Sequence, residues 1–462
     1  MKKIKEKWVL LFLLVFVFII RLIPFFKGSS PLGYDTGLYR GRFSRLDFLD
    51  ISEIAKNEPP FLYYLVDILQ NLGLSTDFIL LGLYFLFNIV LGIFIFLFLR
   101  KKYSYKIGLA GLFLFSVSLV QFEAYFSMYY KNILAFILTL IIFYLIEKKS
   151  WLIILIGGIL LAVHPMSFVL LFSALFLTLI FNKEKRKYLL FSSLGMIGLG
   201  LLFYLNNFYP LIHYLPTNIN KFQNIINIDE SVKTGSFWNI SLFIFYTIWY
   251  LPLAIWAIVQ KVKNKKLDYL VWYFIICSLI IIFGFFFYKR FLVHFDFIII
   301  LISAPILIKL FDFIKKKKEK FYYILFLLMI IFLLVRVFIF SYTSEPLIDD
   351  KNLLEIKNLR YLDGVTIISG DSSVAPWVYG YSEQETIWPG KFKNDKWKKK
   401  EWDIFWSTEN LQKRYELLDQ YDGSLYICLD KDQDELRKII ENDKTFRKYS
   451  DNVWEYFGDN EL

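Results

Sequence analysis

The chain has 462 residues, of which 57% are hydrophobic and 20% aromatic, and its formal net charge at pH 7 is +11. Soluble domains are about 45–50% apolar, so this composition excludes an ordinary soluble protein. The basic residues gather in short segments between apolar runs, so the positive charge reflects membrane topology rather than nucleic-acid binding.

Apolar runs in five places are long enough to cross a membrane as a helix, which takes about 20 residues. They cover residues 8–26, 76–99, 188–206, 239–259 and 321–341. The first run follows the basic segment MKKIKEKW, but no small-residue cleavage site comes after it. We therefore expect a retained first helix and not a cleaved signal peptide.

Basic segments alternate along the chain with segments that contain few Lys and Arg residues. They lie at residues 1–7, 100–106, 147–150, 182–187, 260–266 and 315–320. Cytoplasmic loops carry an excess of Lys and Arg, so these segments are placed in the cytoplasm. The alternation predicts about eleven transmembrane helices, with the N-terminus inside and the C-terminus outside. Residues 151–181 read as two short helices broken at His164-Pro165 or as one kinked helix.

The first outside loop spans residues 27–75 and contains a predicted amphipathic helix. Its apolar residues at helical spacing are Leu62, Leu65, Ile68, Leu69 and Leu72. This pattern favours a helix that lies along the membrane interface.

The composition changes after residue 342. Residues 343–462 contain 17 Lys and Arg but 25 Asp and Glu, a net charge of −8, so residues 1–342 carry +19. Residues 364–371 and 423–431 read as strands, 409–421 and 433–443 as helices, and 446–457 as a hairpin around Asp451-Asn452. The predicted fold is a polytopic α-helical membrane domain over residues 1–342, followed by a small extracytoplasmic α/β domain over residues 343–462.

The candidate site residues lie on the side that is predicted to be outside. Ionisable side chains near the apolar zone of a membrane are costly and are therefore functional candidates. They are Asp35, Glu58, Glu123, Lys131, His164, Lys289 and Arg290, with Arg21, His294 and Asp296 nearby. Carboxylates can act as general bases or bind a metal, and Lys and Arg can hold a phosphate. This combination fits sugar transfer from a lipid-linked phosphate donor.

Several candidates also have a purely structural interpretation. Asp35 could cap a turn, and Glu58 could be an acid at a helix N-terminus. Lys131 and Lys289 could extend to lipid headgroups, and His164 could bond to the backbone at the helix break.

Metal use stays open on the sequence alone. There is no Asp-x-Asp cluster, and neither Cys277 nor Cys428 has metal-ligand spacing, but a divalent metal is compatible with the acids. His294 and Asp296 could pair with each other.

Four stretches resemble the GT-C type membrane glycosyltransferases, which include the protein O-mannosyltransferases and the aminoarabinose transferases. GYDTGLYR followed by NEPPFLYYLVDILQNLG looks like the family's first extracytoplasmic loop, although Glu58 stands where the family has a basic residue or His before the prolines. FSVSLVQFEAYFSMYYKN, GGILLAVHPMSFVLLF and KRFLVHFDFIIILISAPILI are similar to the following family signatures, in the same order.

The resemblance implies transfer of a sugar from a polyprenyl-phosphate donor to an extracytoplasmic lipid, glycan or protein by an inverting single displacement. Asp35 matches the family's catalytic acid, and Glu123 matches a second acidic position that aids a metal or the acceptor. Arg290, with Lys131 or Lys289, would stabilise the departing phosphate. Substrate contacts are expected from Tyr34, Tyr39, Arg40, Glu58 and His164.

Three other functions compete with this interpretation. A polysaccharide polymerase or ligase would share the lipid-linked donor. A lipid or sugar transporter would show repeat symmetry and acids or broken helices at mid-membrane, but the sequence has no repeat. A non-catalytic scaffold would tolerate replacement of Asp35.

Overall fold

The computed structural model describes residues 2–30, 32–33, 35–46, 58–205, 239–285, 288–317, 320–362, 366–369, 374–388, 396–408, 410–421, 423–429 and 433–457. The chain divides into two compact units. The bundle comprises Met1–Ile23 and Phe48–Ser344, and the α/β unit comprises Pro24–Asp47 and Glu345–Leu462. Residues 24–47 lie within the part of the sequence expected to form the membrane domain, but they pack with the C-terminal residues.

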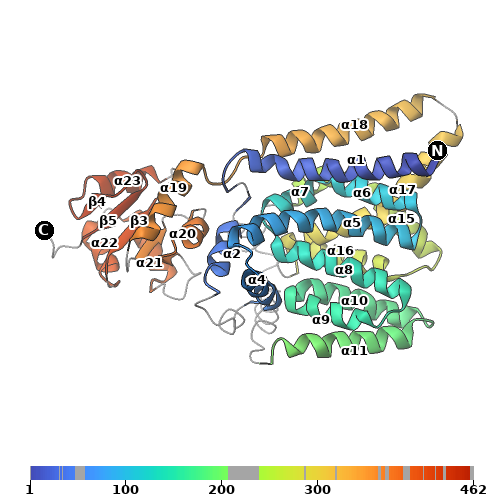
Figure 1. Cartoon of the computed structure of the whole chain (residues 1–462), viewed down its shortest axis with the longest axis horizontal. Helices are drawn as coiled ribbons and strands as arrows, with labels where there is room; N and C mark the ends of the chain where they lie inside the picture. Colours follow the sequence, from blue (N-terminus) through green and yellow to red (C-terminus); the bar gives the residue numbers. More distant parts are fainter. Residues whose placement is uncertain are drawn as a thin grey trace. The chain divides into compact units, whose positions relative to one another are not determined.

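The bundle is built from helices, most of which run roughly along one direction (Figure 1). They are α1 (Lys2–Leu22), α4 (Phe61–Asn71), the π-helical η2 (Phe78–Leu83), α5 (Tyr84–Lys102), α6 (Tyr105–Val117), α7 (Leu119–Phe126), α8 (Tyr130–Lys148), α9 (Leu152–Val163), α10 (Pro165–Phe181), α11 (Arg186–Leu202), α14 (Ile240–Thr247), α15 (Leu251–Lys263), α16 (Tyr269–Ile282), the 3-10 turn η4 (Tyr288–Arg290), α17 (Phe291–Lys317) and α18 (Lys320–Thr343). Helix α4 confirms the predicted helix of the first loop. Its residues Leu62 and Val66 are buried, whereas Ile68 and the C-cap residue Leu72 are exposed.

The membrane fold expected from the sequence is confirmed. The described residues include helical segments long and apolar enough to span a membrane at Glu6–Phe26, Phe78–Lys102, Tyr130–Lys148, Tyr288–Lys316 and Lys320–Thr343. Two bent pairs, α6 with α7 and α14 with α15, raise these five candidate spans to as many as seven. Helices α9, α10 and α16 are apolar but have only 10–17 residues. The sequence predicts about eleven transmembrane helices. The described residues contain up to seven candidate spans and three shorter apolar helices.

Breaks interrupt three of the apolar segments. His164 leaves the helical conformation between α9 and α10, as expected for a residue before proline, so residues 151–181 form two helices. The segment over residues 239–259, predicted as one span, bends by 83° at the junction of α14 and α15, and α6 and α7 meet at 56°. Pro252 in the first turn of α15 is the local signal for the first of these bends.

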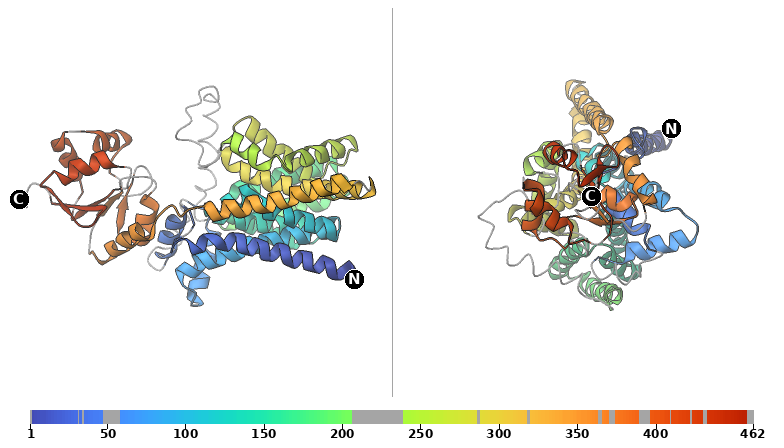
Figure 2. Two further views of the ribbon diagram at one scale, coloured as in Figure 1. Left: turned by 90° about the horizontal axis from the view of Figure 1, so that it is seen from above. Right: turned by 90° about the vertical axis from the view of Figure 1, so that its left-hand side faces the viewer.

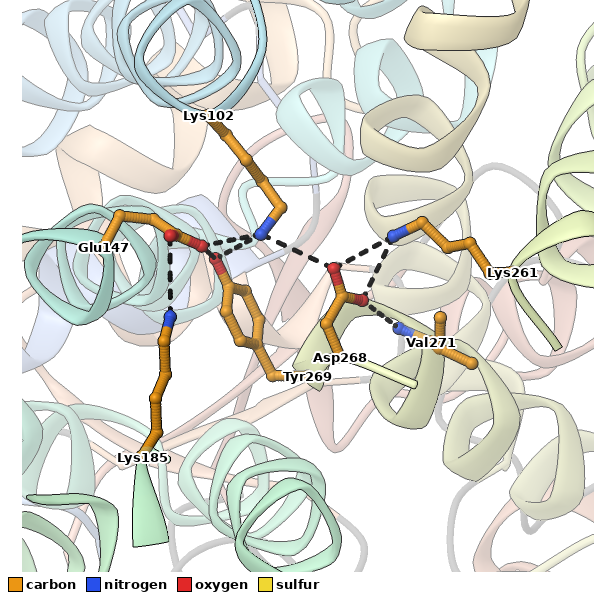
Figure 3. A network of polar contacts seen from close by, with 7 residues as sticks. All are labelled: Lys102, Glu147, Lys185, Lys261, Asp268, Tyr269 and Val271. Atoms are coloured by element: carbon orange, nitrogen blue, oxygen red, sulfur yellow. Dashed lines mark hydrogen bonds and ion pairs between the residues drawn. The ribbon is translucent and has the colours of Figure 1, made fainter. Parts of the chain in front are cut away.

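A polar cluster joins the ends of several bundle helices (Figure 3). It consists of Lys102, Glu147, Lys185, Lys261, Asp268 and Tyr269. The Glu147 carboxylate lies 2.6 Å from the Lys102 ammonium and accepts a hydrogen bond from Tyr269 at 2.6 Å. Asp268 lies 3.0 Å from Lys261 and 3.5 Å from Lys102. The cluster draws on four of the basic segments that the sequence placed on one side of the membrane, so these segments meet at one end of the bundle.

Replacing Asp268 by Asn should lower the melting temperature of the purified protein. The change leaves the partly buried Lys261 ammonium without its carboxylate and removes the second carboxylate beside Lys102, at a cost of about 1–3 kcal/mol. Burial raises the pKa of the Asp268 carboxyl, but Lys261, Lys102 and the hydrogen bond from the Val271 N–H together lower it by more, so its pKa lies below the usual value. The stabilisation is therefore fully present above the ordinary Asp pKa of about 3.9 and is lost as the pH falls through the lowered pKa.

Thermal unfolding in detergent as a function of pH measures both effects. Asp312→Asn is the matched control, because Asp312 is an exposed acid on α17. Equal melting temperatures for the two variants would contradict a stabilising role of the polar cluster.

The α/β unit contains a sheet between two groups of helices (Figure 2). Its elements are α2 (Asp35–Phe43), α19 (Asp350–Asn358), η5 (Leu359–Tyr361), β1 (Thr366–Ser369), α20 (Ala375–Tyr381), β2 (Glu385–Ile387), α21 (Lys399–Ser407), α22 (Leu411–Leu418), β3 (Leu425–Cys428), α23 (Asp434–Glu441), β4 (Phe446–Lys448) and β5 (Val453–Tyr456), preceded by the 3-10 turn η1 (Ile23–Phe26). The strand order is β2-β1-β3-β5-β4, with β1 parallel to β2 and β3, and with β5 antiparallel to β3 and β4. The predicted β1, α22, β3, α23 and terminal hairpin are confirmed.

Alternation of side chains explains the layers of the α/β unit. Ile368 and Ile427 face a core formed with α21, α22 and α23, whereas their neighbours Ile367 and Tyr426 face a core formed with α19 and α20. Successive residues of a strand point to opposite faces, so each face of the sheet packs against one of the two groups of helices.

Helix α2 joins the α/β unit through two close-packed glycines. A Cβ atom on Gly37 would lie 2.1 Å from the Pro376 carbonyl oxygen, and one on Gly380 would lie 2.3 Å from the Gly37 carbonyl oxygen. The lack of a side chain at Gly37 therefore lets α2 approach α20.

Replacing Gly37 by Ala should destabilise the α/β unit by about 1–3 kcal/mol, because the new methyl group would meet backbone that cannot rotate away. The fluorescence of the tryptophans in this unit measures its unfolding. Gly198→Ala is the control, because Gly198 lies in α11 with nothing within 4 Å of an added Cβ. An unchanged melting temperature for Gly37→Ala would contradict the close contact.

Candidate functional site

Asp35 is the first residue of α2 and belongs to the α/β unit. The preceding turn is closed by a hydrogen bond of 2.9 Å from the Thr36 N–H to the Gly33 carbonyl. The Asp35 side chain is half-buried. A helix N-terminus favours negative charge, so the local fold suits a carboxylate at this position.

Two neighbours of Asp35 have partners inside the α/β unit. The Arg40 guanidinium donates a hydrogen bond of 2.6 Å to the Gly380 carbonyl and lies 4.3 Å from the centre of the Tyr381 ring. Tyr39 is buried, with its ring centre 5.8 Å from that of Phe43. Tyr34, the third expected substrate contact in this stretch, lies outside the described residues.

Glu58 and Lys131 form an ion pair in the bundle. Their carboxylate and ammonium groups lie 2.6 Å apart, and their side chains are only 20% and 10% exposed. Tyr63 on α4 donates a hydrogen bond of 2.5 Å to Glu58, and its ring centre lies 4.9 Å from the Lys131 ammonium. Lys131 is therefore held inside the protein and does not extend to lipid headgroups.

His164 caps the helix that follows the α9–α10 break. Its Nδ1 accepts a hydrogen bond of 3.1 Å from the Ser167 N–H and lies 2.6 Å from the Ser167 hydroxyl. The Ser167 hydroxyl also lies 3.3 Å from Nε2 of His294 on α17. His294 in turn lies 2.9 Å from the Tyr273 hydroxyl and 3.5 Å from the Asn132 side chain. This polar chain connects the helix break with the residue that follows Lys131.

Lys131 and Arg290 both act on the environment of His164. Their positive charges lie within electrostatic range of the imidazole ring, although the two residues are carried by α8 and η4. Arg290 is exposed and Lys289 is half-buried. The Lys289 side chain has no hydrogen bond or ion pair to any other described residue. The group of Glu58, Lys131, His164 and Arg290, in which Lys131 and Arg290 are the cations, is here called the cation cluster.

Glu123 lies on the short helix α7, beyond the bend at Ser118. Its charge acts on the Tyr246 phenol of α14, and α14 packs against α7. The structure thus places Glu123 at the contact between two short helices of the bundle.

His294 and Asp296 do not pair with each other, in contrast to one interpretation of the sequence. The side chain of Asp296 is bound by Ser118, Gln121 and Tyr250, and that of His294 lies near Ser167 and Tyr273. Side chains two residues apart on a helix point in different directions.

Sequence reasoning missed the polar residues behind the cation cluster. Ser167 could have been found, because it stands three residues after His164, at the spacing of an N-cap bond. Asn132 and Tyr273 carry no such local signal, since they meet His294 only through tertiary packing. Among the described residues, no group of three or more His, Cys, Asp and Glu side chains is arranged to hold a metal ion.

No protein-family model matches the sequence, and no curated protein does either. Solved structures do match. One is the archaeal oligosaccharyltransferase AglB from Archaeoglobus fulgidus in complex with an inhibitory peptide and a dolichol-phosphate, with a TM-score of 0.63 at 11% identity, covering 92% of this chain and 70% of that chain.

A second structure is the Archaeoglobus fulgidus oligosaccharyltransferase tethered to an acceptor peptide containing the NVT sequon, with a TM-score of 0.62 at 11% identity over 92% of this chain and 69% of that one. A third, the same organism's enzyme with Zn and sulfate, has a TM-score of 0.58 at 11% identity over 90% and 68% of the two chains. The resemblance read from the short motifs is confirmed at the level of the fold: the chain has the fold of the GT-C type membrane glycosyltransferases.

Proposed function

We propose that this protein is a membrane glycosyltransferase that moves a sugar from a polyprenyl-phosphate-linked donor to an acceptor outside the cytoplasm. The observation that carries the proposal is the cation cluster in a bundle of GT-C fold. Lys131 and Arg290, from distant parts of the chain, both lie within electrostatic range of His164. Cations gathered at one place suit the negative charge that develops on a departing lipid phosphate.

The proposed step is a single displacement at the anomeric carbon of the sugar. The acceptor nucleophile forms a bond to this carbon while the bond between the carbon and the phosphate oxygen breaks. The configuration at the anomeric carbon inverts. Asp35 takes the acceptor proton as general base, and the lipid phosphate leaves with the bonding electrons. Arg290, Lys131 and Lys289 stabilise the phosphate. Glu123 assists the acceptor or a metal.

A second candidate function is transfer of a whole oligosaccharide to a peptide. It is favoured by the structural neighbours, whose complexes contain a dolichol-phosphate and an acceptor peptide. The two functions share the lipid-phosphate donor and differ in the size of the transferred sugar and in the acceptor.

A transfer assay with the purified protein in lipid vesicles tests both candidates. Radiolabelled polyprenyl-phosphate monosaccharides and lipid-linked oligosaccharides are supplied separately, with lipid, glycan and peptide acceptors. We expect label in an acceptor with one class of donor. Movement of labelled donor between leaflets without a labelled acceptor would favour a transporter, and no reaction with any donor would overturn the proposal.

We further infer that the bundle end with the polar cluster faces the cytoplasm and that the α/β unit lies outside. The support is the alternation of basic segments, since the cytoplasmic side of membrane proteins is rich in Lys and Arg. A membrane-impermeant maleimide should label Tyr361→Cys in intact cells, because Tyr361 is 70% exposed. It should label Lys266→Cys only after permeabilisation. The native cysteines are buried, and the reverse pattern would contradict the orientation.

A further inference from the structure

Two helix breaks of the bundle meet at one buried carboxylate. Helices α6 and α7 bend by 56° and helices α14 and α15 by 83°. Ser118, with an extended backbone, separates the first pair, and Tyr250 stands directly before the second helix of the other pair. Asp296, which is fully buried in α17, contacts both residues.

The hydrogen bonds at Asp296 come from both breaks. Its carboxylate accepts one bond from the Ser118 hydroxyl at 2.8 Å and one from the Gln121 side-chain amide in the first turn of α7 at 3.0 Å. The Tyr250 hydroxyl donates a further short bond to the other carboxylate oxygen. Tyr250 also lies 3.3 Å from the Ser118 hydroxyl. The two bends therefore share one set of hydrogen bonds.

Local capping contributes to each break as well. The Ser118 hydroxyl accepts a hydrogen bond of 3.1 Å from the Gln121 N–H, and Ser303 of α17 donates one of 2.9 Å to the Tyr250 carbonyl. Irregular backbone at membrane depth is tolerated only where other protein groups satisfy it. Because Asp296 and Ser303 are seven residues apart, they lie on one face of α17. This face supplies the partners of both breaks.

An arginine on α18 also contacts the second bent pair. Arg336 lies within electrostatic range of Asp296 and of the Tyr250 phenol, and it donates a hydrogen bond of 3.2 Å to the Tyr246 carbonyl of α14. Bonds to charged groups in a low-dielectric interior are stronger and more directional than neutral ones. Asp296 is therefore a strong point of attachment for both bent pairs.

We propose that Asp296 is a positioning residue that fixes the bends of the α6–α7 and α14–α15 pairs and thereby the place of Glu123. Glu123 lies on α7 only two residues beyond Gln121, and α7 packs against α14. A change in either bend moves the helix that carries Glu123 or the helix beside it. The structural part of this inference stands alone, and its consequence for catalysis rests on the proposed function.

Distances between spin labels test the structural part without any activity. Phe245→Cys and Val262→Cys place labels on exposed positions of α14 and α15, and Lys106→Cys with Phe126→Cys report on α6 and α7. Asp296→Leu should shift or broaden the distance distributions of both pairs. Ser341→Ala is the control, because it removes an equally buried cross-helix hydrogen bond of 2.7 Å, from α18 to the Ile20 carbonyl. It should leave both distributions unchanged.

Single hydroxyl deletions keep the test decisive if Asp296→Leu does not fold. Tyr250→Phe should shift the α14–α15 distribution, and Ser118→Ala should shift the α6–α7 distribution. The inference is overturned if neither variant changes its own pair, or if a folded Asp296→Leu variant gives both distributions of the unaltered protein.

Transfer activity tests the catalytic consequence. A displacement of about 1 Å can cost about a hundredfold in rate, so Asp296→Leu should lower kcat by a factor of this order while the KM for the donor changes little. In a Glu123→Gln background Asp296→Leu should lower kcat much less, because the effects of substitutions at coupled residues are not additive. Additive losses would remove Glu123 from the inference. If no variant transfers sugar but the label distances shift, the proposed function fails and the role of Asp296 in the bends stands.

Discussion

Replacing Asp35 by Asn should lower kcat for sugar transfer by about 10²–10⁴-fold, the usual contribution of a general base. Asn has nearly the same shape as Asp but cannot accept the acceptor proton. The KM for the donor should change little, because the phosphate contacts are assigned to the cation cluster. Initial rates at varied donor concentration in lipid vesicles measure both parameters.

The stability of the same variant separates catalysis from a structural role. Asp and Asn support helix starts about equally well, so Asp35→Asn should keep the melting temperature of the unaltered protein. If Asp35 only closed a turn, both activity and stability would survive. Asp403→Asn is the matched control, because Asp403 is an exposed acid on α21 in the same unit. Transfer by Asp35→Asn at the rate of this control would remove Asp35 from the mechanism.

The sequence predicts those parts of the fold that depend on local pattern. Long apolar runs predict α1, α5 and α18, because a spanning helix needs about 20 apolar residues. Turn residues and alternating apolar residues predict β1, β3 and the terminal hairpin. The basic segments also predict which helix ends gather together, since Lys102, Glu147, Lys185 and Lys261 meet in one polar cluster.

Long-range packing decides the parts that the sequence does not predict. No proline in the sequence predicts the bend after Val117, and the Ser118 hydroxyl donates its hydrogen bond to Asp296, which is 178 residues away. Residues 24–47 belong to the α/β unit, in which Gly37 packs against the backbone of Pro376. Nothing near Gly37 in the sequence predicts this contact.

In the candidate site, too, the sequence identifies single residues but not the contacts between them. Asp35 and Glu58 stand out as acids among turn-forming residues, so the sequence identifies them one by one. Their partners do not stand out, because Lys131 is 73 residues from Glu58 and Ser167 is 127 residues from His294. Candidate residues could therefore be named from the sequence, but the ion pair and the polar chain behind it could not.

Replacing Lys131 by Met should lower kcat/KM for the lipid-phosphate donor by about a hundredfold or more, a loss typical of removing one group that stabilises developing charge. The substitution removes a cation and also takes from Glu58 the ammonium that lies 2.6 Å from its carboxylate, whereas the hydrogen bond from Tyr63 stays. Removing one partner of a buried ion pair is itself destabilising, by up to about 3–5 kcal/mol. The single variant therefore confounds loss of phosphate binding with loss of stability.

The double variant Glu58→Gln with Lys131→Met separates the two effects. It removes both charges of the ion pair, so the melting temperature should return toward that of the unaltered protein, because replacing both partners of a buried pair is often close to neutral. Transfer should stay low if Lys131 holds the donor phosphate. Recovery of transfer in the double variant would show that Lys131 serves only as the partner of Glu58.

Arg290→Gln provides the comparison for a cation at the surface of the same cluster. Arg290 is exposed, so this variant should lose transfer without losing stability, whereas Lys131→Met should lose both. The loss of transfer caused by Arg290→Gln should also depend less on added salt than the loss caused by removing a remote surface charge. A bound phosphate contacts the guanidinium directly, so salt screens this interaction poorly. If Arg290→Gln transfers sugar normally while Lys131→Met does not, Arg290 does not hold the phosphate, and its proposed role is wrong.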